Sequence, residues 1–179
     1  MRILGIHGRA TIVASQNTLW NKRVDDIRGR GHKIYIPQFD ESDDPRYEAW
    51  AVEMDDFNIE SYDCIIAISH GSGVLARYII ENKVSLNRVV FCSPGRADSN
   101  REHTTEVYNF LENNDVNLEE YIDEIFIVHG TEDKNVPYSE WVKFHKQVGW
   151  EFYALEGFWH KLDEEALTFI NDLAINGKQ

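Results

Sequence analysis

Several features that would place a protein in a specialised class are missing from this 179-residue sequence. It has two cysteines, Cys64 and Cys92, each inside an apolar run, so neither a disulfide framework nor a cysteine-rich metal site is expected. No apolar run approaches the ~20 residues that a membrane-spanning helix needs. The first residues show no long apolar stretch followed by a small-residue cleavage site, so we expect a cytoplasmic protein.

Positive charge is also scarce: 18 Lys and Arg stand against 31 Asp and Glu, which gives a formal net charge of −13. Nucleic acids and anionic membranes are bound through basic surfaces, so we expect neither as a partner. Hydrophobic residues make up 42% of the chain, as in ordinary globular proteins. The length suits one domain with a buried core, and we expect a single domain over residues 1–179.

Short apolar runs alternate along the chain with segments of helical periodicity. Nearly all of the runs are continuously apolar, which is typical of parallel strands covered on both faces. The predicted strands are Arg2–Ile6, Lys33–Ile36, Cys64–Ser69, Arg88–Cys92, Ile125–His129 and Glu151–Leu155. The predicted helices are Asn17–Arg30, Pro45–Phe57, Ser72–Asn82, Glu102–Asn113, Tyr138–Val148 and Asp163–Ile175. The alternation predicts an α/β fold, a three-layer sandwich around a six-stranded, mostly parallel, doubly wound sheet.

The connection after the third predicted strand carries the first candidate for chemistry, because functional crevices lie beyond the carboxyl ends of such strands. Ser69-His70-Gly71-Ser72-Gly73 links a strand to a helix, as the nucleophile elbow of an α/β-hydrolase does. When the segment is aligned with the usual Gly-x-Ser-x-Gly motif, Ser69 occupies the position of the first glycine and Gly71 occupies the position of the serine. The alternative frame makes Ser72 the nucleophile, but it puts His70 and Val74 where small residues are needed.

In the preferred frame the nucleophile position is occupied by Gly71, which has no hydroxyl. An elbow residue with a Cβ is strained by about 1–3 kcal/mol, and glycine relieves that strain. We therefore interpret the chain as a hydrolase-fold protein that is inactive or impaired. Ser72 is the fallback nucleophile, through a shifted elbow, and Ser69 is a less favoured one.

Two further strand ends carry a candidate acid and a candidate base. Asp133 lies in the loop His129–Pro137, where an acid can orient a histidine; the alternative is a turn or capping role. Glu132 is the weaker choice, because the Asp-x-x-Val-Pro spacing points to its neighbour. His160 follows the last predicted strand in a glycine-containing loop, where a general base can reach the elbow. Elbow, acid and histidine follow one another in the α/β-hydrolase order.

The connection after the first strand is the candidate oxyanion hole. His7-Gly8 ends that strand, and the backbone N–H of Arg9, or of Ala10, would donate one hydrogen bond. The second would come from Ser72, the residue after the nucleophile position. His7 itself is equally a candidate for strand-end packing. The histidines show no spacing typical of a metal site, and no metal or cofactor is expected.

Taken together, these segments resemble the small serine hydrolases of the retinoblastoma-binding-protein and YdeN type, a branch of the α/β-hydrolase superfamily with little or no lid. The resemblance runs through Ile3–Gly8, Trp20, Arg28–Pro37, Pro45–Trp50, the elbow, Gly130–Pro137 and Gly157–His160. It implies hydrolysis of small esters or amides without a cofactor, with Asp133 as acid and His160 as base. Gly71 departs from the family's serine, and Ser69 departs from its glycine.

Four hypotheses remain open at this point. The chain is a non-catalytic binding or scaffold module for a small ester or amide ligand or for a protein partner. It is an active hydrolase that uses Ser72. It is an active enzyme into which Gly71 was engineered. It is a flavodoxin-like nucleotide-binding module, for which Gly8-Arg9-Ala10-Thr11 is poor in glycine.

Overall fold

The computed structural model describes residues 1–9, 18–40, 42, 44–94, 102–113, 117–138, 150–158 and 164–178. Within these ranges six strands form one sheet in the order β2-β1-β3-β4-β5-β6, and every neighbouring pair is parallel. The strands are β1 (Arg2–Ile6), β2 (Lys33–Tyr35), β3 (Cys64–Ile68), β4 (Leu86–Cys92), β5 (Ile122–Gly130) and β6 (Glu151–Leu155). The predicted six-stranded parallel sheet is confirmed.

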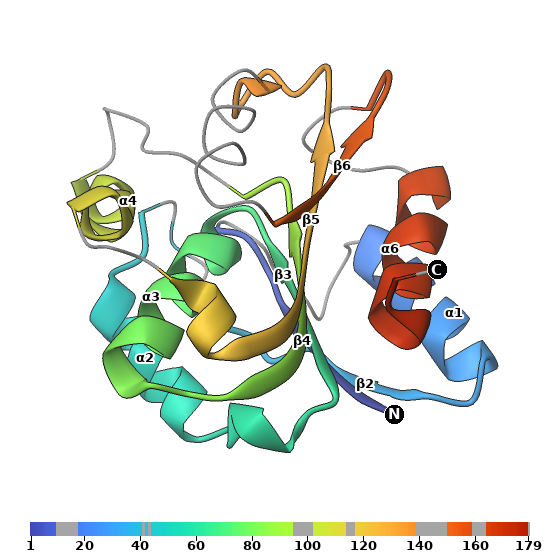
Figure 1. Ribbon diagram of the computed structural model, residues 1–179, viewed down its shortest axis with the longest axis horizontal. Coiled ribbons are helices and arrows are strands. Elements are labelled where there is room, and N and C mark those ends of the chain that lie inside the picture. The colour runs from blue at the N-terminus through green and yellow to red at the C-terminus, as the bar shows by residue number, and fades with distance from the viewer. Residues whose placement is uncertain are drawn as a thin grey trace.

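Helices cover both faces of the sheet, as continuously apolar strands require (Figure 1). They are α1 (Thr18–Gly29), α2 (Tyr47–Asp55), α3 (His70–Asn82), α4 (Glu102–Asn113) and α6 (Glu164–Asn176). Short 3₁₀ turns occupy Ile59–Ser61 and Leu118–Glu120. Helices α1 and α6 lie on one face of the sheet, and α2, α3 and α4 lie on the other. None of the helices in the described ranges is long and apolar enough to cross a membrane.

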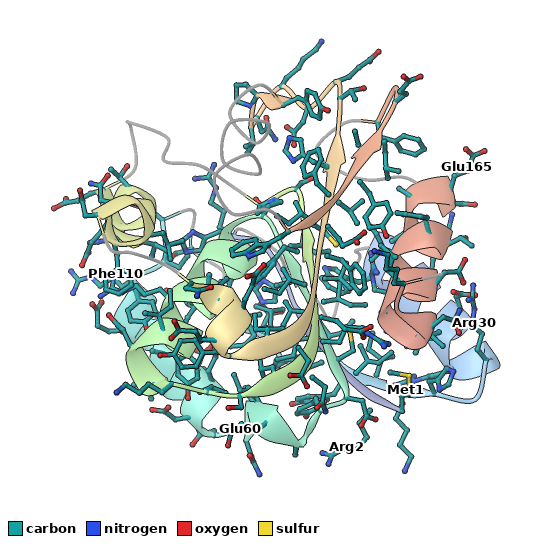
Figure 2. The ribbon with its side chains drawn as sticks, viewed as in Figure 1. Met1, Arg2, Arg30, Glu60, Phe110 and Glu165 are labelled. Atoms are coloured by element: carbon teal, nitrogen blue, oxygen red, sulfur yellow. The ribbon has the colours of Figure 1, made fainter. Side chains whose placement is uncertain are left out.

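Two buried cores separate the three layers, because successive strand residues face opposite sides of the sheet. Leu4 and Ile65 belong to the core beneath α2 and α3, whereas their neighbours Ile3 and Ile66 belong to the core beneath α1 and α6. Figure 2 shows side chains filling the space on both sides of the sheet. The predicted three-layer architecture is therefore confirmed.

The element boundaries agree with the prediction at most ends, and the largest functional difference is at the elbow. Strand β3 ends at Ile68 and α3 begins at His70, whereas the sequence prediction extended the strand to Ser69 and began the helix at Ser72. Strands β4 and β5 also begin earlier than predicted, at Leu86 and Ile122. The helix predicted over Tyr138–Val148 lies, after Tyr138, outside the described residues.

The strand order places a topological switch point between β1 and β3. From β1 the chain moves to β2 on one side, and it then returns to build β3, β4, β5 and β6 on the other side. The chain leaves the carboxyl ends of β1 and β3 toward helices on opposite faces of the sheet. Ligands of open α/β sheets bind at such a switch point, beyond the carboxyl ends of the strands, and here Gly8 and Ser69 follow those two strand ends.

Candidate active site

Ser69 forms a sharp turn between strand β3 and helix α3. Its backbone has φ 52° and ψ −121°, a positive φ that side chains with a Cβ rarely adopt. Its N–H donates to the carbonyl oxygen of Cys92 at 2.9 Å, so the turn is anchored to the neighbouring strand β4. A strained residue directly between a buried strand and a helix is the backbone form of a nucleophile elbow. The elbow residue is therefore Ser69.

The prediction that Gly71 occupies the elbow is wrong. Gly71 is the second residue of α3, and a Cβ added to it would lie 2.4 Å from the carbonyl oxygen of His7 and 2.9 Å from Cγ2 of Ile6. The glycine is needed for the close approach of α3 to β1, and it does not relieve strain in a turn. The elbow motif reads Ala67-Ile68-Ser69-His70-Gly71, in which alanine fills the first small position.

Ser72, predicted as fallback nucleophile and as oxyanion donor, has both of its polar groups engaged elsewhere. Its side chain is buried, and its hydroxyl donates to the carbonyl oxygen of Ala67 at 2.9 Å. Its backbone N–H donates to the carbonyl oxygen of Ser69 at 3.0 Å. Ser72 thus closes the first turn of α3 onto the end of β3. This geometry supports neither of the two predicted roles of Ser72.

The chain that follows β1 packs directly against Ser69. A Cβ built on Gly8 would lie 3.2 Å from the Cβ of Ser69 and 3.8 Å from its hydroxyl oxygen. Arg9 is the next residue after this contact. On the other side, α3 begins at His70, and the first N–H groups of a helix have no partner within the helix. The N–H groups of Arg9 and His70 are therefore the candidate oxyanion donors.

His7 fixes the loop that carries Gly8 and Arg9. Its Nε2 accepts a hydrogen bond from the N–H of Phe39 at 2.9 Å, so Nδ1 carries the proton and donates to the carbonyl oxygen of Gly8 at 2.6 Å. The ring is fully buried, and burial lowers the pKa of His7. A neutral imidazole therefore joins the loop after β1 to the loop after β2.

Asp133 lies in a tight turn at the end of β5, as the sequence predicted. Its carboxylate is buried, and its Oδ1 accepts hydrogen bonds from the backbone N–H groups of Asn135 and Val136, each at 2.9 Å. Beside it, Nε2 of His129 donates to the carbonyl oxygen of Val136 at 3.0 Å and lies 3.8 Å from Oδ2 of Asp133. The turn interpretation and the acid interpretation are thus compatible, because one oxygen builds the turn.

Hydrogen bonds join the Asp133 turn to the segment that follows β6. The N–H of Glu132 donates to the carbonyl oxygen of Phe158 at 3.1 Å, and the N–H of Thr131 donates to that of Leu155 at 3.0 Å. A Cβ on Gly130 would lie 2.2 Å from the carbonyl oxygen of Phe158, so this contact also requires a glycine. His160, the predicted base, comes two positions after Phe158 and lies outside the described residues.

Sequence reasoning undervalued Ser69 and missed His70. The signal for Ser69 was the apolar run Cys64–Ile68, which ends directly before it, together with Ala67 at the first small position of the motif. His70 is buried, and burial together with the positive charge of Arg9 lowers the pKa of its ring to about 4. Within the described ranges, no group of three His, Cys, Asp or Glu residues is arranged to hold a metal ion.

Comparison with known proteins identifies the architecture. No family model matches the sequence, and no curated protein matches it. Among solved structures, the ydeN gene product from B. subtilis superimposes with a TM-score of 0.77 at 15% identity, over 96% of this chain and 95% of that one. The chain has the α/β-hydrolase fold.

Two further solved structures with this fold have names that mention a substrate or a ligand. A monoacylglycerol lipase from Paleococcus ferrophilus matches with a TM-score of 0.76 at 13% identity, over 99% of this chain and 95% of that one. Est1E from Butyrivibrio proteoclasticus, with ferulic acid bound, matches with a TM-score of 0.69 at 16% identity, over 97% and 86%. The superposition thus extends over nearly the whole chain. At sequence identities this low, it shows a shared fold and nothing more.

Proposed function

We propose that this protein is a serine hydrolase that cleaves small esters or amides, with Ser69 as nucleophile, His160 as general base and Asp133 as the acid that orients it. The observation that carries the proposal is the strained backbone of Ser69 between β3 and α3. Strain of this kind costs on the order of 1–3 kcal/mol and clusters at functional sites. The hydrolase-fold neighbours, a lipase among them, support the same class of reaction.

The proposal replaces the interpretation of an inactive protein. That interpretation depended on a missing hydroxyl at the elbow, and it loses its support because the elbow residue is Ser69. It also removes the reason to invoke an engineered Gly71, since the glycine is required by the approach of α3 to His7. A purely binding role for a protein partner stays as the outcome that a negative activity test would favour.

In the proposed reaction the Ser69 hydroxyl attacks the carbonyl carbon of the substrate and gives its proton to His160. The N–H groups of His70 and Arg9 donate to the oxyanion of the tetrahedral intermediate. The intermediate collapses, His160 returns the proton to the leaving alcohol or amine, and Ser69 remains acylated. Water, deprotonated by His160, then attacks the acyl carbon, and His160 returns the proton to the Ser69 oxygen as the bond to the acyl group breaks and the acid leaves. Asp133 stabilises the imidazolium in both steps.

The backbone bonds between the two loops support the pairing of acid and base. Because Glu132 donates to Phe158, the residue before Asp133 is tied to a residue two positions before His160. The described segment after β6 therefore reaches the acid turn at Phe158, two positions before the proposed base in the sequence. We also propose a cytoplasmic location, in line with the buried, unpaired thiols of Cys64 and Cys92.

The test uses a fluorophosphonate probe and p-nitrophenyl butyrate on the full chain and on two matched serine variants. We expect the wild type to be labelled at one site and to release nitrophenol. Ser69→Ala should lose labelling and lower kcat/KM by about 10⁴-fold or more. Ser72→Ala should stay labelled, because in the wild type the Ser72 hydroxyl only donates to the carbonyl oxygen of Ala67. Labelling that survives in Ser69→Ala, or a folded wild type that neither reacts nor hydrolyses, would refute the proposal.

A further inference from the structure

Strand β5 carries a fully buried histidine, His129, at the end of a run that is otherwise apolar. The four residues before it, Ile125–Val128, are all buried hydrophobic residues, and Gly130 ends the strand. An imidazole loses its hydration when it is buried, whereas an aliphatic side chain would fill the same space without that cost. A histidine at this position is therefore informative, and its hydrogen bonds show what it does.

The ring of His129 bonds to the far end of the acid turn. Its Nε2 lies 3.0 Å from the carbonyl oxygen of Val136, seven positions later in the chain. A carbonyl oxygen can only accept, so Nε2 carries the proton and donates. Val136 is buried as well, at 4% exposure, so this bond is shielded from water, and its loss would leave a buried carbonyl oxygen without that donor.

Val136 in turn holds the carboxylate of Asp133 through its other backbone group. Its N–H donates to Oδ1 of Asp133 at 2.9 Å, next to the equivalent bond from Asn135. The second carboxylate oxygen, Oδ2, lies 3.8 Å from Nε2 of His129. His129 thus fixes the peptide that fixes the carboxylate, and the proton on its Nε2 lies on the side of Oδ2.

His129 is a rigid anchor because it belongs to the sheet, whereas Asp133 lies in a turn beyond it. In register, His129 is paired with Ala154 of β6, and the preceding Val128 is paired with Cys92 of β4. Groups held on strands are positioned more precisely than groups held on loops alone. The hydrogen bond from His129 therefore transfers the fixed position of β5 to the turn that carries the acid.

A second histidine at a strand end in the same site acts in a comparable way. His7 directly follows β1, and its ring bonds to the backbone of Gly8 and of Phe39. In both places a buried imidazole joins the end of a strand to loop backbone at the carboxyl edge of the sheet. The arrangement at His129 is thus not an isolated contact, and it lies on the side of the acid.

We propose that His129 is a positioning residue for the acid: by donating from Nε2 to the Val136 carbonyl oxygen, it holds the carboxylate of Asp133 in the orientation that serves the base. The inference rests on the proposed role of Asp133 in the serine hydrolase reaction. It adds a residue outside the proposed triad, one that acts through Asp133 and does not touch the substrate.

The experiment measures kcat and KM for p-nitrophenyl butyrate in the wild type, His129→Phe, His129→Gln and the control Ile27→Ala. Phe keeps a planar ring and removes both nitrogens, whereas Gln keeps an N–H donor. Ile27 is a buried residue of α1, a helix that packs on β2 and α6. Its truncation lowers stability without touching the acid turn, so it shows what a merely structural defect does to the kinetics.

We expect His129→Phe to lower kcat by about 10²-fold with little change in KM, because a small misplacement of a catalytic group has an effect of that size. His129→Gln should recover kcat to within about tenfold of the wild type, since its donor can bond the same carbonyl oxygen. Ile27→Ala should unfold at lower urea but keep its kcat. A folded His129→Phe variant with the kcat of the wild type would overturn the inference.

A double-mutant cycle with Asp133→Asn tests whether His129 acts through the acid. If it does, the two substitutions remove the same contribution, and His129→Phe should lower the kcat of Asp133→Asn by less than about threefold. The same loss of kcat from His129→Phe in both backgrounds would mean that the two residues act independently, and that result would overturn the inference.

A further measurement needs neither a variant nor activity. Long-range ¹H–¹⁵N NMR spectra of the wild type report which ring nitrogen of each histidine carries a proton, and we expect a proton on Nε2 of His129. A ring with its only proton on Nδ1 would overturn the inference while leaving the proposed function intact. A folded wild type that is neither labelled by the fluorophosphonate nor active would instead refute the serine hydrolase function.

Discussion

Two regions of the candidate site are held together by different means. In the elbow region, formed by His7, Gly8, Ser69 and Gly71, backbone segments approach closely because two glycines leave no side chain between them. In the acid region, formed by Gly130–Val136 and Leu155–Phe158, backbone N–H groups and the Asp133 carboxylate form a network of hydrogen bonds. The difference teaches that Ser69 is positioned by packing, whereas Asp133 is positioned by polar contacts.

Asp133→Asn should produce the largest effect and should separate the two tasks of the acid region. The amide oxygen of Asn can still accept from the N–H groups of Asn135 and Val136, so the turn should remain. The loss of the negative charge next to the proposed base should lower kcat by about 10⁴-fold. Nitrophenyl ester kinetics and urea unfolding measure the two effects separately.

Asp133→Ala is the matched comparison for that prediction. It removes the carboxylate together with both acceptor contacts, so the free energy of unfolding should fall by about 1–3 kcal/mol, more than in Asp133→Asn. Full activity in Asp133→Asn would show that the carboxylate builds the turn and takes no part in the reaction.

Gly71→Ala should produce the next largest effect, because it breaks the elbow region by overpacking. The new Cβ would meet the carbonyl oxygen of His7 at 2.4 Å, and backbone atoms cannot move aside as a flexible side chain can. We expect the free energy of unfolding to fall by about 3 kcal/mol in urea denaturation.

Gly29→Ala serves as the control for this prediction, since it lies in α1 and has nothing within 4 Å of an added Cβ. It should leave stability unchanged or raise it by up to about 1 kcal/mol, because alanine favours a helix. Equal effects of the two substitutions would show that close packing does not position the elbow.

The same two regions explain why the sequence predicted the fold and the turn of Asp133 but misplaced the sharp turn of Ser69. Continuous apolar runs such as Cys64–Ile68 report strands directly, and Asp133 sits in a local signature whose contacts are two and three residues away. The elbow contains Ser69, Gly71, Ser72 and Gly73 in close succession, and all four are small. Which of them has room for a side chain depends on His7, a residue far away in sequence that α3 meets only after folding.

The lowered pKa of the buried His70 gives a third test of how tightly the elbow region is packed. The pKa of His70 is lowered to about 4, from an ordinary value of 6.5, by burial and by Arg9. The unfolded chain therefore binds more protons than the native one below pH 6.5, so stability is fully present above that pH and is lost as the pH falls toward 4. From pH 7 to pH 5, His70 should account for about 2 kcal/mol of lost stability.

His70→Phe isolates this contribution, because the carboxylates and His7 titrate in both proteins. Urea unfolding at pH 7 and at pH 5 should show a smaller loss of stability in the variant than in the wild type. Equal losses of stability in the two proteins would mean that the His70 ring is solvated or paired in the native state.

The smallest expected effect concerns strain at the elbow itself. Ser69 has a positive φ with a Cβ attached, which costs on the order of 1–3 kcal/mol, and glycine adopts this backbone freely but loses more entropy on folding. Ser69→Gly should therefore raise the free energy of unfolding by about 1 kcal/mol, whereas Ser69→Ala, which keeps the Cβ, should leave it nearly unchanged. Both variants lack the hydroxyl, so the difference between them in urea denaturation reports the relief of strain minus the entropy that glycine loses on folding. If Ser69→Gly were no more stable than Ser69→Ala, the close packing around Gly8 and Gly71 would hold the turn without strain, and the positive φ would lose its weight as a sign of function.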